Sequence, residues 1–332
     1  MRPIHYPLSA IRYPPSSLKN SYLDFGFYFV SRYARVKIPH PKPKIVKLPF
    51  FLARRFVADE KLEGTLSVLR DLHGKGLHTT VDLLGEYISE RRLALLARDA
   101  YIDLLQTLAD EHRLNGTDPN ISIKLSMMGQ KIDEDFCLDN LRQLLSVAKE
   151  HHAFIRLDME GSDVIESTLR LFETVYPECP DHVGIVLQAY LKRTHRDVER
   201  MCELNARVRL CKGAYKEPPE IAHQSMDVIR AHFVGYMKRL IPNAHYPGIA
   251  THDDLLIDAT KAFVEEQGID HDRFEFQMLY GLRPKTQQQI ARDGYHMRVY
   301  VPYGTQWLPY YSRRLRERKE NIFFLFKHMF RD

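Results

Sequence analysis

Cysteine is scarce in this sequence, and its few copies lie far apart. Cys137, Cys179, Cys202 and Cys211 are the only four among 332 residues, and no two of them have the CxxC spacing. A disulfide framework or a cysteine-based zinc site needs paired or closely spaced cysteines. Isolated cysteines are typical of buried thiols in a reducing compartment, so we expect a cytoplasmic protein.

Long apolar runs are missing as well. Residues 1–15 (MRPIHYPLSAIRYPP) are interrupted by prolines and lack the apolar run of a secretory signal. Residues 22–30 are apolar, but they are too few to span a bilayer and include Asp24. Any membrane contact is therefore expected to be peripheral, at the inner face of the cytoplasmic membrane.

Several well-defined catalytic motifs are absent. The sequence has no HExxH, no GxSxG and no phosphate-binding GxxxxGK[ST], and its His and Cys residues do not cluster with metal-ligand spacing. The one Gly-x-Gly, Gly74-Lys75-Gly76, precedes an expected strand, whereas a dinucleotide fingerprint follows one. We expect no metal site, and any redox cofactor must bind outside a Rossmann turn.

The positive charge is concentrated in one segment. The chain carries a net charge of +5, but residues 25–58 contain eight Lys or Arg and no acid, which leaves the remainder net negative. A uniform nucleic-acid-binding surface is therefore excluded, and no nucleic-acid-binding motif is present. The basic segment either touches an anionic membrane or is simply solvated.

Short β-branched or apolar runs alternate with amphipathic helical stretches from about residue 78 onward. Eight such runs are present, at residues 78–84, 121–126, 154–158, 182–188, 208–212, 248–252, 274–279 and 297–301. Helical spacing is clearest at residues 91–105, 138–148 and 221–240. Eightfold βα alternation predicts a parallel (β/α)8 barrel, which at this length forms a single domain.

Residues 1–75 stand outside this alternation. Residues 38–44 (IPHPKPK) are proline-rich and predict an extended linker, whereas residues 62–72 have helical spacing. We therefore expect a short extended and helical N-terminal appendage over residues 1–75 and the barrel over residues 76–332.

Polar residues occur where the barrel strands are expected to end. They are Lys124, Asp158, Gln188, Arg209, Lys212, Thr251, His252, Gln277 and Tyr300. Burying so many polar groups without a ligand would be costly. Because barrel chemistry lies at the C-terminal ends of the strands, these residues predict an active site there. Arg209 and Lys212 have opposite strand parity, so Lys212 is expected beyond its strand, in the turn at Gly213.

Two adjacent arginines, Arg313 and Arg314, follow the last expected strand. Pro309 and Ser312 indicate a helix start, which would place the pair in the first turn, where the helix dipole already favours an anion. Two guanidinium groups can hold a small carboxylate through paired hydrogen bonds. The alternative is a solvated helix end with Arg313 paired to Glu317.

The segments around these residues resemble those of monofunctional bacterial proline dehydrogenases. The similarity extends over roughly residues 53–325, in the order and at the spacing of that family. The matching segments are 53–58 (ARRFVA), 123–126 (IKLS), 157–160 (LDME), 187–190 (LQAY), 209–215 (RLCKGAY), 250–253 (ATHD), 274–281 (FEFQMLYG), 298–304 (RVYVPYG) and 310–315 (YYSRRL).

The resemblance implies a distorted (βα)8 barrel that uses FAD. It implies oxidation of L-proline to Δ1-pyrroline-5-carboxylate, the first step of proline catabolism to glutamate, with electrons passed to a membrane quinone. Asp158 and Arg209 would be catalytic. The substrate would be bound by Lys124, Leu279, Tyr300, Tyr310, Arg313 and Arg314. FAD would be bound by Met159, Gln188, Arg209, Lys212, Gly213, Ala214, Thr251 and His252.

Position 300 bears on the choice of substrate within this resemblance. Relatives that prefer hydroxyproline carry a smaller residue where this chain has Tyr300. The tyrosine therefore implies proline as the substrate.

Three other interpretations remain open at this point. A Schiff-base aldolase on the same barrel would use Lys124 or Lys212 as its nucleophile. A related flavin barrel acting on a folate would not need the paired arginines. A non-catalytic membrane-surface protein would use the basic segment and residues 323–326 (FFLF), which otherwise fit an amphipathic helix packed on the barrel.

Overall fold

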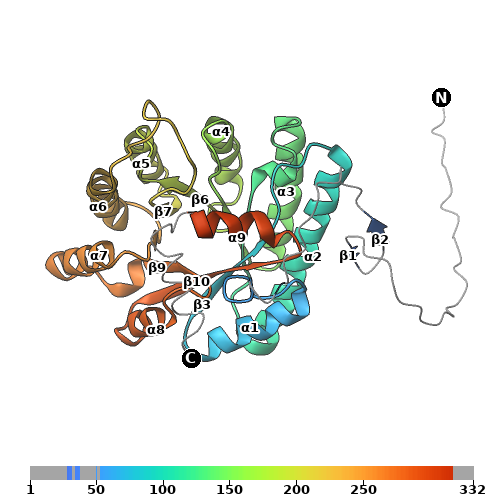
Figure 1. Cartoon of the computed structure of the whole chain (residues 1–332), viewed down its shortest axis with the longest axis horizontal. Coiled ribbons are helices and arrows are strands. Elements are labelled where there is room, and N and C mark those ends of the chain that lie inside the picture. The colour runs from blue at the N-terminus through green and yellow to red at the C-terminus, as the bar shows by residue number, and fades with distance from the viewer. Residues whose placement is uncertain (1–27, 32–33, 38–49, 51–52, 317–332) are drawn as a thin grey trace, which may run out of the picture.

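The fold is a closed barrel of eight parallel strands surrounded by helices (Figure 1). It is seen in a computed structural model that describes residues 28–31, 34–37, 50 and 53–316. The strands are β3 (His78–Leu83), β4 (Asn120–Ile123), β5 (Phe154–Leu157), β6 (Val183–Gln188), β7 (Arg207–Cys211), β8 (Gly248–Ala250), β9 (Glu275–Leu279) and β10 (His296–Tyr303). Pairing of β10 with β3 closes the barrel, which confirms the expected fold class.

Helices follow the strands in regular alternation. They are α1 (Leu62–Gly74), α2 (Arg91–Asn115), α3 (Glu134–Glu150), α4 (Ile165–Val175), α5 (Thr194–Glu203), α6 (Met226–Asn243), α7 (Asp254–Gln267), α8 (Pro284–Arg292) and α9 (Trp307–Arg316). Single 3-10 turns lie at Leu125–Met128, Tyr176–Glu178 and His271–Arg273. Before the barrel, β1 (Tyr28–Ser31) and β2 (Ala34–Lys37) form an antiparallel pair. Within the described ranges, the helices are too short or too polar to cross a bilayer.

The hydrophobic core lies between the barrel and its helices. Each barrel strand places at least one fully buried side chain in this layer. These side chains are Val81, Ile121, Ile155, Ile185, Val208, Ile249, Phe276 and Val299. Full burial of such a side chain stabilises the fold by about 1.5–3 kcal/mol. The alternate strand positions face the barrel interior, so the apolar layer leaves that interior free for polar side chains.

Helix α1 precedes the barrel in sequence but packs on it. Its Leu69 and Leu72 are buried in the same core cluster as the strands. The Ala58 N–H also donates to the Pro302 carbonyl at 2.9 Å, tying the entry segment to β10. The division of the chain at residue 75 stays a prediction. The proline-rich segment, most of the basic segment and residues 323–326 lie outside the described residues.

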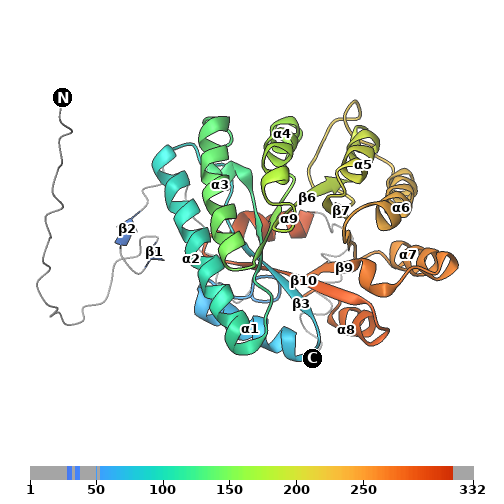
Figure 2. The same ribbon diagram turned by 180° about the vertical axis from the view of Figure 1, so that it is seen from behind.

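The last helix begins earlier than the sequence indicated. Helix α9 starts at Trp307, so Arg313 and Arg314 lie in its second turn, and the expectation of a first-turn position is wrong. The cause is packing: Trp307 and Tyr310 are buried with Phe56 and Val57, and Trp307 Nε1 donates to Glu60 at 3.0 Å. Pro309 is tolerated because the first turn needs no N–H donor at that position. Helix α9 lies across the barrel, at the C-terminal end of β10 (Figures 1 and 2).

A glycine on β6 makes room for an arginine inside the barrel. A Cβ at Gly184 would lie 2.5 Å from both Arg156 Nη1 and the Arg207 carbonyl oxygen. That nitrogen donates to the same carbonyl across β6. Since a backbone oxygen cannot move aside, only glycine fits here.

We therefore predict that Gly184→Ala lowers the free energy of unfolding by about 1–3 kcal/mol or more, as overpacking does. Gly235→Ala is the matched control, because Gly235 lies in helix α6 with nothing within 4 Å of an added Cβ. The control should stabilise by about 0.5–1 kcal/mol. Urea unfolding measures both, and a similar change in the two variants would contradict this account.

Candidate active site

The barrel interior is lined by charged and polar side chains at its C-terminal end. Arg209 on β7 lies at the centre of this network. Its Nη1 donates to Asp158 Oδ1 at 2.6 Å, its Nη2 donates to Ser122 Oγ at 2.9 Å, and its Nε donates to Gln277 Oε1. These partners belong to three other strands, so the guanidinium group crosses the barrel interior.

Tyr300 completes the cluster from β10. Its hydroxyl donates to Asp158 Oδ2 at 2.7 Å, and the Arg209 guanidinium carbon lies 5.2 Å from the centre of its ring. Burial raises the pKa of Tyr300 well above its ordinary value, so the hydroxyl stays protonated and acts as a donor. Three residues predicted from separate strands, Asp158, Arg209 and Tyr300, therefore lie in direct contact.

Lys124 has a partner that sequence reasoning missed. Its Nζ lies 2.8 and 3.0 Å from the two carboxylate oxygens of Asp82 on β3, and both side chains are buried. Burial alone would lower the pKa of Lys124, but the negative charges of Asp82 and Asp158 outweigh burial and raise it. The available signal was a carboxylate between two apolar residues, Val81 and Leu83. It has the strand parity of Thr80, whose hydroxyl contacts Ser122 on the neighbouring strand β4.

These contacts argue against the aldolase interpretation. A Schiff-base lysine must lose its proton to act as a nucleophile, whereas Lys124 is held in its charged form. Lys212, just beyond β7 as expected, donates to Asp253 Oδ2 at 3.0 Å, and that carboxylate also accepts from Arg230 at 2.9 Å. Lys212 is thus part of an ion-paired cluster in the loops after β7 and β8.

The residues predicted for the cofactor follow three neighbouring strands. Gln188 ends β6, Lys212, Gly213 and Ala214 follow β7, and Thr251 and His252 follow β8. Gln188 is 3% exposed, and its Nε2 lies 3.4 Å from the Met159 carbonyl. Its Oε1 is buried without a hydrogen-bond partner among the described residues. A buried acceptor left in this state fits a ligand that supplies the donor.

Gly213 shapes the turn after β7. Its φ of +115° is in the region that favours glycine, and an added Cβ would lie 2.2 Å from the Tyr190 ring. The turn is thus held close against Tyr190. His252 Nε2 accepts from the Leu279 N–H at 3.0 Å, which leaves Nδ1 as the protonated nitrogen of the neutral ring. In the ranges that the structure describes, no group of His, Cys, Asp or Glu could hold a metal ion.

Three of the predicted substrate residues, Tyr310, Arg313 and Arg314, belong to helix α9. Leu279 at the end of β9 packs against the small cluster that contains Trp307 and Tyr310. The backbone of helix α9 carries Arg313 and Arg314 one turn farther on, and their side chains lie outside the described residues. The cluster thereby links the last barrel strands to the helix that bears both arginines.

Comparison with known proteins points to one family. The sequence profile described as proline dehydrogenase matches residues 65–326. Proline dehydrogenases 2 and 1 of Bacillus subtilis are 38% and 40% identical to this chain over 277 and 275 residues, covering 83% of it and 90% and 89% of themselves. The proline dehydrogenase of Deinococcus radiodurans is 39% identical over 282 residues, which cover 84% of this chain and 90% of that protein.

A solved structure shows the same fold. Proline utilization A from Bdellovibrio bacteriovorus, inactivated by N-propargylglycine, superposes with a TM-score of 0.75 at 27% sequence identity over 80% of this chain. The chain spans about a third, 32%, of that longer protein.

The buried ion pair of Lys124 and Asp82 generates a stability prediction. Lys124→Met should lower the free energy of unfolding by about 3–5 kcal/mol, because it leaves a buried carboxylate without its counter-charge. Replacing both residues, as Asp82→Asn with Lys124→Met, should recover most of the loss. Urea unfolding of the two single variants and the double variant measures this.

The same loss should depend on pH. Burial raises the pKa of Asp82 even beside Lys124, and loss of Lys124 raises it further. The destabilisation by Lys124→Met is then full at pH values where Asp82 is ionised in both the folded and the unfolded protein. It vanishes below the pKa of Asp82 in the unfolded protein, about 4. A loss that stays constant from pH 8 to pH 4 would contradict this interpretation.

Proposed function

Since the chain belongs to the proline dehydrogenase family, we propose that it oxidises L-proline to Δ1-pyrroline-5-carboxylate with FAD as hydride acceptor and a quinone as final electron acceptor. Family membership makes it an oxidoreductase that oxidises proline in proline catabolism. The observation that carries the finer proposal is the contact of Asp158, Arg209 and Tyr300 at the C-terminal end of the barrel, each at its family motif position.

The proline carboxylate requires cations beyond Lys124. The charge of Lys124 is already matched by Asp82, so this ion pair has no net charge. Without further cations, the carboxylate of bound proline would lack a counter-charge. Arg313 and Arg314 on helix α9 supply two more cations, and paired guanidinium groups suit a carboxylate. We assign Arg313, Arg314 and Lys124 to the carboxylate, and Leu279, Tyr300 and Tyr310 to the walls around the proline ring.

Catalysis by the chain's own residues is mainly positioning and electrostatics. The carboxylate contacts would hold the ring so that the carbon beside the nitrogen, on the side away from the carboxylate, faces the hydride acceptor. Tyr300 is fixed by its bond to Asp158, and Asp158 is fixed in turn by Arg209. The three side chains therefore form a rigid wall, which limits the orientations that the substrate can adopt.

The cofactor residues fit a flavin. The unpartnered Oε1 of Gln188, the buried Thr251 and the close turn at Gly213 support this assignment. Met159, Gln188, Arg209, Lys212, Gly213, Ala214, Thr251 and His252 would hold FAD. When bound, the flavin supplies the redox chemistry as a hydride acceptor.

Contact with the membrane is part of the same proposal. A quinone resides in the bilayer, and the basic segment at residues 25–58 suits an anionic surface. We therefore assign the protein to the cytoplasm, with peripheral contact at the inner face of the membrane.

Anaerobic addition of L-proline to the purified protein tests the activity. We expect a yellow protein whose flavin absorbance bleaches with proline and returns when a soluble quinone is added. If proline does not bleach the flavin, the proposed activity is refuted. If proline bleaches the flavin but quinone does not restore its absorbance, only the assignment of quinone as electron acceptor is refuted. A visible spectrometer under anaerobic conditions is sufficient.

The two arginines on helix α9 provide a second test. Arg313→Met and Arg314→Met should each raise the KM for proline by about tenfold to a hundredfold, the value of a hydrogen bond to a charged group. Arg292→Met is the control, because Arg292 is an exposed arginine on the preceding helix α8. Steady-state kinetics measure all three. Unchanged KM values in the α9 variants would favour the folate alternative.

A further inference from the structure

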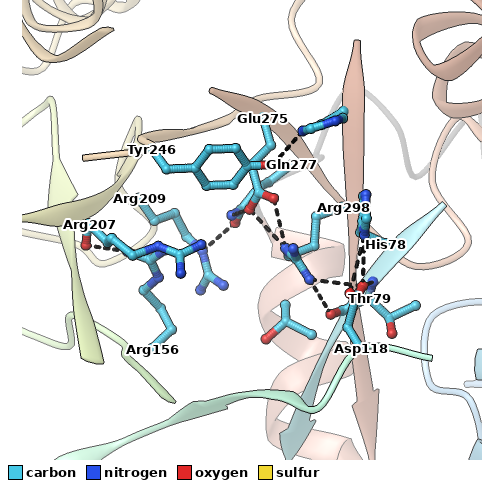
Figure 3. Close-up of polar contacts among 12 residues, drawn as sticks. His78, Thr79, Asp118, Arg156, Arg207, Arg209, Tyr246, Glu275, Gln277 and Arg298 are labelled. Carbon is cyan, nitrogen blue, oxygen red and sulfur yellow. Dashed lines mark hydrogen bonds and ion pairs between the residues drawn. The ribbon is translucent and has the colours of Figure 1, made fainter. Parts of the chain in front are cut away.

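A chain of buried hydrogen bonds continues from Arg209 toward the opposite end of the barrel (Figure 3). Arg209 Nε donates to Gln277 Oε1, and Gln277 Nε2 donates to Glu275 Oε1. Glu275 accepts from Arg298 Nε at 2.8 and 2.9 Å through its two oxygens. All four side chains are at most 6% exposed, so water does not compete for these bonds.

This chain permits only one orientation of the Gln277 side chain. The Nε of Arg209 can only donate, and the ionised carboxylate of Glu275 can only accept. The amide must therefore turn its oxygen toward Arg209 and its nitrogen toward Glu275. Rotation of the amide by 180° would bring two donors together at Arg209 and two acceptors together at Glu275.

Glu275 is held in its ionised form. Burial would raise the pKa of Glu275, but the Arg298 guanidinium outweighs burial and lowers it. Arg298 is anchored in turn, because its Nη1 donates to the Thr79 carbonyl at 2.7 Å and to Asp118 at 3.2 Å. The far end of the chain is thus tied to the backbone of β3.

A neighbouring glycine shows that the fold accommodates this amide. A Cβ at Gly248 on β8 would lie 2.4 Å from Gln277 Nε2. The side chain of Gln277 therefore occupies space that any larger residue on β8 would fill. The position of the amide is set by the backbone on one side and by Glu275 on the other.

We propose that Glu275 is a positioning residue for Arg209, acting through the amide of Gln277. Glu275 lies at the start of β9 and does not contact Arg209 itself, so its effect passes through the single permitted orientation of the amide. The proposal rests on the proposed function, in which Arg209 is one of the residues that hold FAD. Misplacing this cation would weaken its stabilisation of the reduced, more negative cofactor.

The test removes the anchor together with its counter-charge, while Asp118, which loses Arg298, keeps its contact with His78 at 3.0 Å. E275M/R298M replaces the ion pair by two apolar side chains, a change that is often neutral for stability. We expect flavin reduction at saturating proline to slow about tenfold, as misplacement at a reacting centre does. The KM for proline should stay within about twofold, the flavin midpoint potential should fall, and the urea midpoint should not change.

Two further variants separate positioning from general damage. Gln277→Met removes the amide and should slow flavin reduction and lower the potential in the same way. The exchange E275Q/Q277E places a carboxylate next to Arg209 and an amide next to Arg298. Arg209 Nε then again meets an acceptor, so this variant should retain most of the wild-type rate. If E275M/R298M fails to fold, these two variants still test whether Glu275 positions Arg209 through Gln277.

Glu111→Gln is the matched control. Glu111 accepts two hydrogen bonds from Arg70 outside the barrel, as Glu275 accepts two from Arg298 inside it. The Glu111→Gln variant should leave both the rate of flavin reduction and the flavin midpoint potential unchanged. Equal rates and potentials in wild type, Q277M and E275M/R298M would overturn the proposal. Failure of the wild-type protein to bleach with proline would instead refute the proposed function, so the two failures are distinguishable.

Discussion

The burial of the Arg209 guanidinium group is the constraint on which the site depends. A charge taken out of water is costly unless it is paired with an opposite charge and hydrogen-bonded. Arg209 meets this condition through Asp158, which directly follows β5, Ser122 on β4 and Gln277 on β9. One side chain thus connects four strands of the barrel. Any shift of these strands would break a buried hydrogen bond, so the site inherits the rigidity of the barrel.

Three cations of the barrel interior are matched by carboxylates. Lys124 is matched by Asp82, Arg209 by Asp158, and Arg298 by Glu275. This balance explains how strands with polar inner faces are stable, since their outer faces bury an apolar layer against the helices. Arg156 differs, because it donates to the backbone carbonyls of Ile185 and Arg207. At the C-terminal end, where Lys124 and Arg209 are both paired, little positive charge is left over for an anionic substrate. The proposed role of helix α9 follows from this balance.

The sequence predicted the architecture well because its signal is local and repeated. The eight runs of apolar residues match β3 to β10 closely, since each run is bounded by polar loops. The start of helix α9 was predicted wrongly, because packing of Trp307 and Tyr310 against Phe56 decides it and that contact joins distant parts of the chain. Asp82 and Glu275 were missed for a similar reason, because each acts by pairing with a cation that is distant in sequence, Lys124 and Arg298 respectively.

By itself, the sequence determined the alternation of strands and helices, the family resemblance and the residue types at the strand ends. Periodicity and motif order are properties of the chain read along its length, so no contact is needed to see them. Only the tertiary structure decided which charges are paired, which way the Gln277 amide points and where helix α9 begins. These depend on distances between residues far apart in sequence, and in a buried interior such distances determine whether a charge is compensated or left alone.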